Sequence, residues 1–424
     1  MVISGSKSEE LSFKLRQYFR PSLPINRHDL FRGREKLIGS LTGALNQDGR
    51  HVVIYGERGV GKTSLANMIA LDTSFGGPNA LVVSHINCES LAQSGDLWKE
   101  LFREVEFLCK EKKIKLSRAS TMELVSFHNL NRVTGGDAQR ITRALAKDLK
   151  LIYIFDEFDM LEDEDAKREL AETIKLFSDR NAPATIVIVG VADDIENLVK
   201  SHQSIERCVS QLKLPRMSKT EIENIIVSCL DTVEMTIEKG AIQEISRIAK
   251  GLPHYAHLLG LHTGLFALQH FRTQVVQNDV RGGVTDALDN SMASIERTYQ
   301  MAVTSSSKVA QYREILLACA VTVSDEFGYF SPTDVCGPLT KIKGAPAKVE
   351  AFGRHLHSFC EPDRGSILKK ASLSTNRARF RFGNPLLEPY VLMKGLTNSQ
   401  IKVEDIPTYE PRAVQLELFP QDDL

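Results

Sequence analysis

The sequence predicts an α/β fold in which a parallel sheet with intervening helices is followed by two smaller, mostly helical regions. Three observations support this. An apolar run at residues 51–55 leads into a glycine-rich segment and a helix-forming stretch at 64–71. A second apolar run, at residues 151–155, is continuous, as expected for a parallel strand that is buried on both faces. After residue 216, apolar residues recur mainly at helical spacing.

Composition bounds the size and class of the protein. The chain has 424 residues, of which 42% are hydrophobic and 25% charged, enough for two or three domains. Because the formal net charge is only -1, any surface for nucleic acid must be local. No apolar stretch approaches the length of a membrane span, and residues 1–30 lack a signal-peptide core. The seven cysteines are scattered singly, so we expect free thiols in a soluble, cytoplasmic protein.

The glycine-rich segment has the pattern G-x-x-x-x-G-K-[ST] between a predicted strand and a predicted helix, which is the setting of a P-loop. Glycines at 56, 59 and 61 allow positive φ and let backbone N–H groups surround phosphate. Lys62 is expected to reach the β and γ phosphates and Thr63 to bind Mg²⁺, while the helix N-terminus adds to the anion site. The residues expected to contact the nucleotide are Gly56, Glu57, Arg58, Gly59, Val60, Gly61, Lys62, Thr63 and Ser64.

Two carboxylates, Asp156 and Glu157, follow the second apolar run. Parallel strands present their carboxyl ends to ligands. Asp156 is expected to hold Mg²⁺ through water, since Mg²⁺ prefers a few carboxylates and retained water. Glu157 is expected to orient and deprotonate the attacking water, because phosphoryl transfer needs mainly positioning and charge neutralisation. With Lys62, the pair predicts an ATPase that uses ATP and Mg²⁺.

The segment before the first strand reads Phe31-Arg32-Gly33-Arg34-Glu35 and opens an amphipathic helix. It resembles the F-x-G-R-E entry of AAA+ and STAND ATPases, which lines the adenine pocket. The resemblance implies that Phe31 and Arg34 contact the nucleotide; an ordinary surface helix start is the alternative. The preceding residues, 1–30, are expected to form an arm that ends near two prolines.

Two further positions resemble the AAA+ pattern after the predicted strand at 185–190. The first is the strand tip, where the family often carries an Asn beside the γ-phosphate. Its match here is Asp193, which accepts hydrogen bonds instead of donating them. The second is Arg207, which resembles the arginine that reaches a neighbouring subunit's nucleotide and offers permanent charge to the phosphate. A local salt bridge is the alternative role for Arg207.

A helical lid is predicted next. Ser218 and Glu221 form a capping box before a periodic helix, and Pro253 stands at the tolerated first turn of a later helix. The G-x-P start at 251–253 resembles the lid of AAA+ and STAND ATPases, whose next residue is often the sensor 2 arginine. This chain has His254, which could contact phosphate when protonated. A neutral lid histidine is the alternative.

Taken together, residues 30–270 resemble most the AAA+ clade of origin-recognition and replication-initiation ATPases, with transposition-regulator and STAND signalling ATPases as relatives. The resemblance implies a P-loop AAA+ core with a parallel sheet, a helical lid subdomain and a C-terminal winged helix. The expected divisions are an N-terminal arm (1–30), the ATPase core (31–215), the lid (216–285), the winged helix (286–395) and a flexible acidic tail (396–424).

The C-terminal third predicts three helices and a two-stranded wing, with alternating residues at 377–382 as one strand. Cations greatly outnumber acids around this wing, so it could sit on DNA phosphates. A protein partner is the alternative. The residues expected to contact double-stranded DNA are Lys369, Lys370, Arg377, Arg379 and Arg381.

The tail carries no core pattern and is expected to be flexible. It contains Gln415-Leu416-Glu417-Leu418-Phe419, which resembles the pentapeptide by which bacterial polymerases and repair factors bind the sliding clamp. The resemblance implies that Gln415 supplies hydrogen bonds, and that Leu418 and Phe419, with Leu416 beside them, occupy an apolar groove.

The sequence thus predicts an ATP-dependent AAA+ switch that assembles as a homo-oligomer, on DNA or with partner proteins. One alternative is a STAND-like signalling or defence ATPase whose winged helix gates oligomerisation. Another is a nucleotide-binding adaptor with little turnover, which the residues at positions 193 and 254 would favour.

Overall fold

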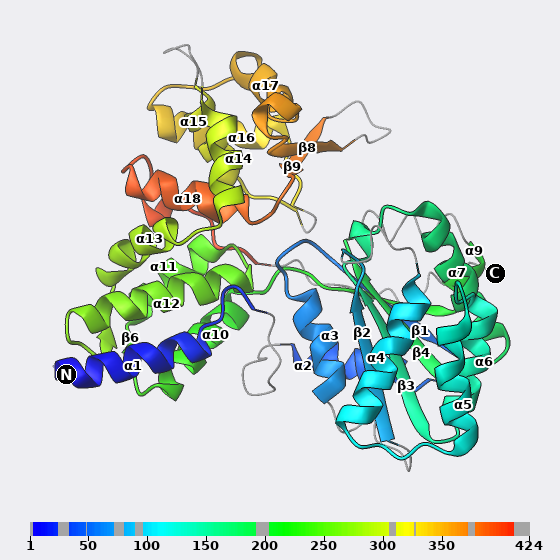
Figure 1. Ribbon diagram of the computed structural model, residues 1–424. Coiled ribbons are helices and arrows are strands. Elements are labelled where there is room, and N and C mark those ends of the chain that lie inside the picture. Colours follow the sequence, from blue (N-terminus) through cyan, green and yellow to red (C-terminus); the bar gives the residue numbers. More distant parts are fainter. Residues whose placement is uncertain are drawn as a thin grey trace, which may run out of the picture. The chain divides into compact units, whose positions relative to one another are not determined.

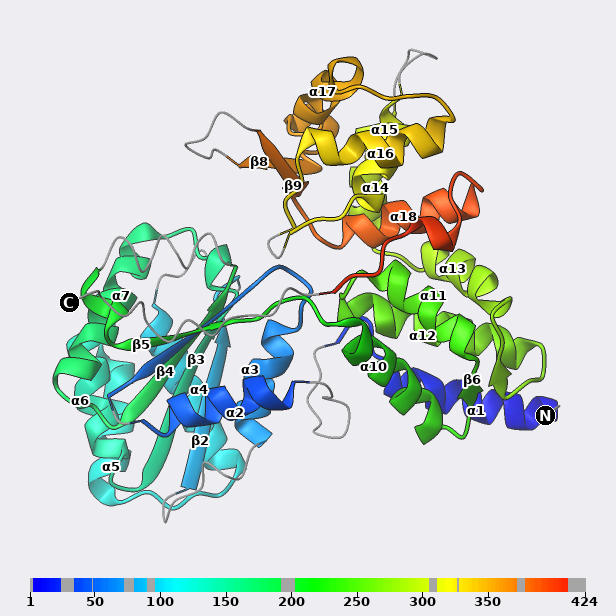
Figure 2. The ribbon, with the colours of Figure 1, turned by 180° about the vertical axis from the view of Figure 1, so that it is seen from behind.

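The computed structural model describes residues 3–23, 34–47, 49–71, 80–89, 96–191, 203–304, 311–325, 328–371 and 378–410. The chain forms two compact units. The sheet unit contains residues 24–57 and 61–214, and the helical unit contains residues 1–23, 58–60 and 215–424. Figure 1 labels their helices and strands, and Figure 2 shows the same ribbon from behind.

The sheet unit is built on five parallel strands in the order β2-β3-β4-β1-β5, which confirms the predicted α/β class. The strands are β1 (His51–Tyr55), β2 (Ala80–Asn87), β3 (Leu149–Asp156), β4 (Ala184–Gly190) and β5 (Val209–Lys213). Every residue of β3 except Lys150 is buried, as its continuous apolar sequence predicts. Since the strands are parallel, β1 and β3 end at the same edge of the sheet.

Helices connect these strands on the two faces of the sheet (Figure 1). They are α2 (Glu35–Leu45), α3 (Lys62–Leu71), α4 (Leu97–Glu111), α5 (Arg118–Ser126), η4 (Phe127–Asn129), α6 (Gly135–Leu145), η5 (Phe158–Met160), α7 (Glu164–Asp179) and α9 (Gln203–Glu206). Trp98 of α4 lies at the centre of an aromatic cluster, with ring centroids 5.3 Å from Phe155 and 5.7 Å from Phe177. The polar segment at 111–136 also joins this core, because Phe127 is fully buried.

The first half of the helical unit is a bundle that corresponds to the predicted lid. Its elements are α10 (Lys219–Thr232), β6 (Thr236–Ile237), α11 (Lys239–Ala249), α12 (Pro253–Gln269), β7 (Gln274–Val275) and α13 (Asp279–Asp289). The capping box predicted at Ser218 is present, with Glu221 as its partner. Pro253 occupies the first turn of α12, where its missing N–H costs no hydrogen bond.

The N-terminal arm contains a helix, α1 (Gly5–Tyr18), which packs against α12 and α10 of the same unit. Leu15 and Phe19 are buried there. They approach Gly260 and Gly264 of α12 so closely that a Cβ on either glycine would meet the Phe19 or Leu15 side chain at 2.4 or 2.7 Å. The arm is therefore an integral part of the bundle, held by two glycines one helical turn apart.

In the second half of the helical unit, the described residues form four α-helices and a short 3-10 helix, followed by an antiparallel hairpin. In order, its elements are α14 (Ala293–Val303), α15 (Tyr312–Val321), α16 (Pro332–Lys343), α17 (Val349–Ser358), η6 (Pro362–Arg364), β8 (Leu368–Ala371), β9 (Arg379–Phe382), α18 (Leu387–Thr397) and η7 (Val403–Asp405). The hairpin pairs Lys369 with Arg381 and Lys370 with Phe380. The alternating residues of β9 thus form a strand, with Phe380 and Phe382 on its buried side.

The expectation of a flexible tail from residue 396 is wrong for its first part. Residues 396–410 complete α18, form η7 and bury Ile406 completely. Tyr409 lies against Gly251, and the Arg216 guanidinium is 5.8 Å from its ring centroid. Ile401 is buried as well, so two isoleucines and Tyr409 pack a segment whose composition is otherwise that of a loop. Among the described residues, no helix is long and apolar enough to span a membrane.

Candidate functional site

The P-loop joins β1 to α3, as the sequence predicts. Gly59 and Gly61 have φ of 84° and 96°, a region that other residues rarely adopt. Gly56 does not have positive φ, contrary to our expectation, and its small size serves close packing instead. A Cβ at Gly56 would lie 2.3 Å from the carbonyl oxygen of Leu214. Gly59 and Gly61 therefore give the loop its backbone conformation. Gly56 allows the loop to pack closely against Leu214, the residue after β5.

The lysine of the P-loop is turned toward its own backbone. Lys62 Nζ donates hydrogen bonds to the carbonyl oxygens of Gly56, at 3.1 Å, and Glu57, at 3.0 Å. These contacts hold the ammonium group inside the loop, close to where bound phosphate would lie. Of the neighbouring predicted residues, Val60 is buried, Arg58 is exposed, and Ser64 is half-buried.

The two predicted metal ligands meet although they are far apart in the sequence. The Thr63 hydroxyl, at the start of α3, lies close enough to Asp156, at the end of β3, to help lower the pKa of that carboxyl. The Glu157 backbone N–H donates a hydrogen bond to Asp156 Oδ1 over 2.8 Å. Burial alone would raise the pKa of Asp156, but the hydrogen bond and the electrostatic attraction of His85, together with the Thr63 hydroxyl and the Glu157 amide, hold it below its ordinary value. Asp156 is therefore a buried, ionised carboxylate at the P-loop.

Two residues of β2 contact the carboxylate pair, and the sequence alone did not identify them. His85 Nε2 is 3.2 Å from Asp156 Oδ2, and the Asn87 side-chain amide donates to Glu157 Oε2 over 2.6 Å. The strand register explains both contacts, because Asn87 pairs directly with Asp156 and His85 precedes it on the same side of β2. Polar residues at the end of an otherwise apolar strand were the available signal.

Glu157 has an uncommon backbone conformation, with φ of 52° and ψ of 40°. Left-handed backbone is rare for a residue with a side chain and recurs at functional sites. Burial is the main cause that raises the pKa of Glu157 above its ordinary value, and the hydrogen bond from Asn87 opposes it. The carboxylate is therefore a stronger base than an exposed glutamate.

The adenine and sensor positions are described only in part. Phe31 and Asp193 lie outside the described residues, whereas Arg34 is described and buried. Near the strand tip, Asp159 Oδ1 accepts a hydrogen bond from the Val191 backbone N–H over 3.1 Å. This bond ties the loop after β3 to the end of β4.

Arg207 lies at the surface of the sheet unit, with 68% of its side chain exposed. It forms an ion pair with Asp179 at 2.7 Å. The local salt bridge that we considered is therefore present within one chain. An exposed ion pair contributes little free energy, so Arg207 could exchange this partner for another. Its role toward a neighbouring subunit stays a prediction.

His254 follows Pro253 in the first turn of α12 and points to the N-terminal arm. Its Nδ1–H donates to the Pro21 carbonyl oxygen over 2.7 Å. Burial lowers the pKa of His254, and the bond to Pro21 opposes this only partly. The side chain is thus neutral at ordinary pH and engaged within the helical unit. This geometry favours the neutral lid histidine over a cationic phosphate contact.

The basic hairpin of the helical unit is partly engaged in internal contacts. Lys369 and Lys370 of β8 are exposed. Arg379 instead pairs with Asp325 at 2.7 Å, and the Arg381 guanidinium stacks 4.9 Å from the Tyr329 ring centroid. Arg377 and the pentapeptide at 415–419 lie outside the described residues.

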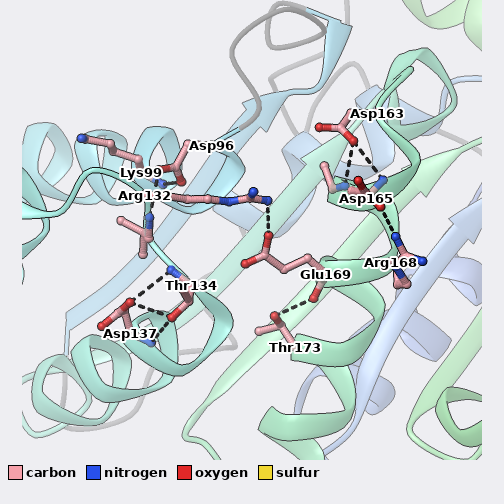
Figure 3. Close-up of polar contacts among 12 residues, drawn as sticks. Asp96, Lys99, Arg132, Thr134, Asp137, Asp163, Asp165, Arg168, Glu169 and Thr173 are labelled. Carbon is pink, nitrogen blue, oxygen red and sulfur yellow. Dashed lines mark hydrogen bonds and ion pairs between the residues drawn. The ribbon is translucent and has the colours of Figure 1, made fainter.

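A second polar cluster of the sheet unit surrounds a small hollow between the start of α4 and α7 (Figure 3). Arg132 and Glu169 form an ion pair across it, and Asp96 accepts hydrogen bonds from the backbone N–H groups of Lys99 and Val133. Asp163 caps the N-terminus of α7. The described polar groups of this cluster satisfy one another, so it is a structural feature of the helix termini.

Comparison with known proteins identifies the class. Residues 22–326 match the family described as Novel STAND NTPase 1, and the chain belongs to this family of P-loop NTPases. A search of curated proteins finds no match. STAND ATPases were among the relatives that the sequence resemblance included, and the family match confirms that relation.

Solved structures with a similar fold cover nearly the whole chain. A Walker-type ATPase of Pyrococcus abyssi superposes with a TM-score of 0.53 at 16% identity, over 88% of this chain and 99% of that one. The ORC2 protein of Aeropyrum pernix in ADPNP-ADP complexes gives a TM-score of 0.49 at 13% identity, over 92% and 97%. The ORC1 protein of Aeropyrum pernix in complex with DNA gives 0.44 at 14% identity, over 92% and 97%.

Proposed function

We propose that this protein binds and hydrolyses ATP with Mg²⁺ and uses the bound nucleotide as a switch. The observation that carries the proposal is the approach of Thr63 to Asp156, which brings the start of α3 next to the acidic pair at the end of β3. Lys62 lies in the same loop and would move from its carbonyl partners to the phosphates. Membership of an NTPase family agrees with this assignment.

The residues present suit Mg²⁺. A hydroxyl and an ionised carboxylate are the hard oxygen donors that this ion prefers, and Asp156 stays ionised because its pKa is lowered. Thr63 and Asp156 would hold the ion, which when bound neutralises charge on the phosphate oxygens. Glu157 would orient the attacking water and accept its proton, with Oε2 held by Asn87. The P-loop N–H groups and Lys62 would bind the phosphates.

Nucleotide binding by the purified chain is the direct test. We expect Lys62→Ala to weaken ATP and ADP binding about 10- to 150-fold, the range for losing a charged hydrogen-bonding group. A matched control is Lys99→Ala, because Lys99 Nζ also donates to a carbonyl, that of Leu130, but away from the P-loop. Titration calorimetry with Mg²⁺ present measures both variants. Equal affinity of Lys62→Ala and wild type would refute the P-loop assignment.

We consider two forms of the switch, namely assembly on DNA or with partner proteins, and STAND-like signalling. The family match favours the signalling form. In that form ADP holds the winged helix on the ATPase core, and ATP releases it for oligomerisation. We expect purified protein to retain ADP and to increase in mass when a non-hydrolysable ATP analogue replaces it. Size-exclusion chromatography with light scattering measures the mass. Unchanged mass together with turnover equal to a Glu157→Gln control would favour the nucleotide-binding adaptor.

DNA binding is a second candidate activity, which the exposed lysines of β8 favour. We interpret α15, α16 and α17 with the β8–β9 hairpin as a winged helix. Lys369 and Lys370 would then contact phosphates, with a smaller contribution from Arg379 because Asp325 already holds it. The double variant Lys369→Ala/Lys370→Ala should lower the salt slope of duplex binding by about 2, while Lys112→Ala/Lys113→Ala at the exposed end of α4 should not. Absence of salt-sensitive binding by wild type would exclude this activity.

Sliding-clamp binding is proposed from sequence alone. Deleting residues 415–419 should abolish any clamp pull-down and leave nucleotide affinity unchanged. Wild-type protein that never binds the clamp would end this proposal.

A further inference from the structure

The Asp156 carboxylate has a contact that the P-loop chemistry does not by itself require. Its Oδ2 lies 3.2 Å from His85 Nε2 on β2, while its Oδ1 accepts the Glu157 N–H. The side chain of Asp156 is only 5% exposed and that of His85 is 27% exposed. The histidine therefore connects a buried carboxylate to a partly exposed position of β2.

The chemistry of the pair assigns the donor. An ionised carboxylate has no proton to donate, so the hydrogen bond must run from His85 Nε2–H to Asp156 Oδ2. A carboxylate offers about four lone-pair sites. Two are taken by hydrogen bonds from His85 of β2 and from the Glu157 amide, and the Thr63 hydroxyl of α3 lies close to the carboxylate. About two lone pairs are left to face Thr63 and the water shell of a metal ion.

We propose that His85 is a positioning residue for the metal site: it holds the Asp156 side chain in the orientation that directs its remaining lone pairs toward Thr63 and the P-loop. The inference rests on the proposed function, because it concerns how the same site binds Mg²⁺. His85 touches neither nucleotide nor metal in this arrangement and acts only through Asp156.

The sheet explains why the residue must come from β2. His85 pairs with Ile154 in the β2–β3 register, so its ring reaches along the sheet edge to the carboxylate that ends β3. A lysine or arginine at this place would cancel the negative charge of Asp156, whereas an imidazole N–H orients the carboxylate without a permanent cation. Groups that orient metal-binding side chains in this way commonly contribute 10- to 100-fold to metal affinity.

The test separates metal binding from nucleotide binding in the full-length chain. A fluorescent ADP analogue is titrated in EDTA and at increasing Mg²⁺, and the Mg²⁺ concentration for half-maximal gain in affinity is measured. We expect His85→Leu to raise that concentration about tenfold and to leave the affinity in EDTA unchanged. His85→Gln, whose amide N–H can reach Oδ2, should recover most of the loss.

Two further variants guard against a purely structural effect. His85→Asn is polar but too short to reach Oδ2, so it should behave like His85→Leu, and it serves if the leucine variant does not fold. His128→Leu is the matched control, because His128 forms a histidine–carboxylate pair with Glu106 at 2.9 Å elsewhere in the sheet unit. It should leave the Mg²⁺ dependence unchanged.

Either of two results overturns the inference. One is a Mg²⁺ dependence of His85→Leu and His85→Asn equal to that of wild type; the other is an equal loss of affinity with and without Mg²⁺. Wild-type protein that binds the analogue but shows no effect of Mg²⁺ would instead refute the proposed metal site, and His85 would lose its role with it.

Discussion

Asp156 in the sheet unit and Glu388 in the helical unit are both buried carboxylates, with 4% and 3% of their surface exposed. Burial alone would raise both pKa values, yet both are lowered. Glu388 is neutralised by two cations, with Arg216 at 2.7 Å and Lys250 at 3.1 Å. Asp156 has hydrogen bonds from His85 and from a backbone amide, with the Thr63 hydroxyl close by, and none of these groups is a permanent cation.

The difference separates a charge that is paired within the chain from one that is not. The charge of Glu388 is cancelled by Arg216, just before α10, and by Lys250, just after α11. The donors to Asp156 hold its carboxylate in place without a permanent positive charge. The site therefore still attracts a cation from solution. A buried carboxylate that has no permanent cation beside it is therefore the better candidate for a metal site, even where both groups have lowered pKa values.

The largest effect is expected at the functional end of this comparison. Glu157→Gln should lower ATP turnover about 100-fold or more, because a general base is lost while the side-chain size is kept. Nucleotide affinity should stay close to wild type. Phosphate release measures turnover, and Glu162→Gln, at an exposed position after β3, is the control. Equal turnover of wild type and Glu157→Gln would mean that the chain is an adaptor and not an ATPase.

The structural carboxylate should matter for folding instead. Glu388→Ala leaves Arg216 and Lys250 buried without their anion, which should lower the free energy of unfolding by about 3–5 kcal/mol. Urea unfolding of the helical unit, followed by circular dichroism, measures this. Glu350→Ala, at an exposed position of α17, should change little. A fully stable Glu388→Ala protein would contradict the role assigned to the buried ions.

The dependence of stability on low pH should also report on the ion cluster of Glu388, Arg216 and Lys250. Because the pKa of folded Glu388 is lowered from 4.5, its contribution to stability is complete above the unfolded pKa and is lost as pH falls through the folded value. The difference in urea midpoint between wild type and Glu388→Gln should therefore shrink as pH falls below about 4.5. Comparing the two proteins removes the contribution of Asp156, whose lowered pKa acts in the same direction. A constant difference across this range would contradict the assignment.

The smallest effect on stability is expected at an exposed pair. Arg207→Ala should change the free energy of unfolding by less than about 1 kcal/mol, because the ion pair with Asp179 is open to solvent. If Arg207 also serves a neighbouring subunit, the variant should bind ATP normally, hydrolyse it slowly and regain activity when mixed with Glu157→Gln. Asp179→Ala is the control, since it removes the pair but keeps the arginine. No rescue in the mixture would leave Arg207 with the surface role alone.

Much of the site could be predicted because its main residues are local in sequence. The P-loop places Lys62 and Thr63 at a strand–helix junction, and Asp156 and Glu157 end an apolar strand. Their partners His85 and Asn87 were not predicted, because no short pattern marks them. They become neighbours only through the register of β2 with β3. The sequence likewise left the arm without a structure, although Gly260 and Gly264 on α12 allow α1 to dock.

By itself, the amino-acid sequence determined the P-loop, the strand that carries the acidic pair, the helix starts marked by Ser218 and Pro253, and the α/β class. Each depends on residues within one or two turns or one strand. Tertiary structure alone decided that Thr63 reaches Asp156, that His254 faces Pro21, and that Glu388 gathers two cations from the lid. These contacts join segments up to 233 residues apart, as for His254 and Pro21, and packing of whole elements sets them where local spacing cannot.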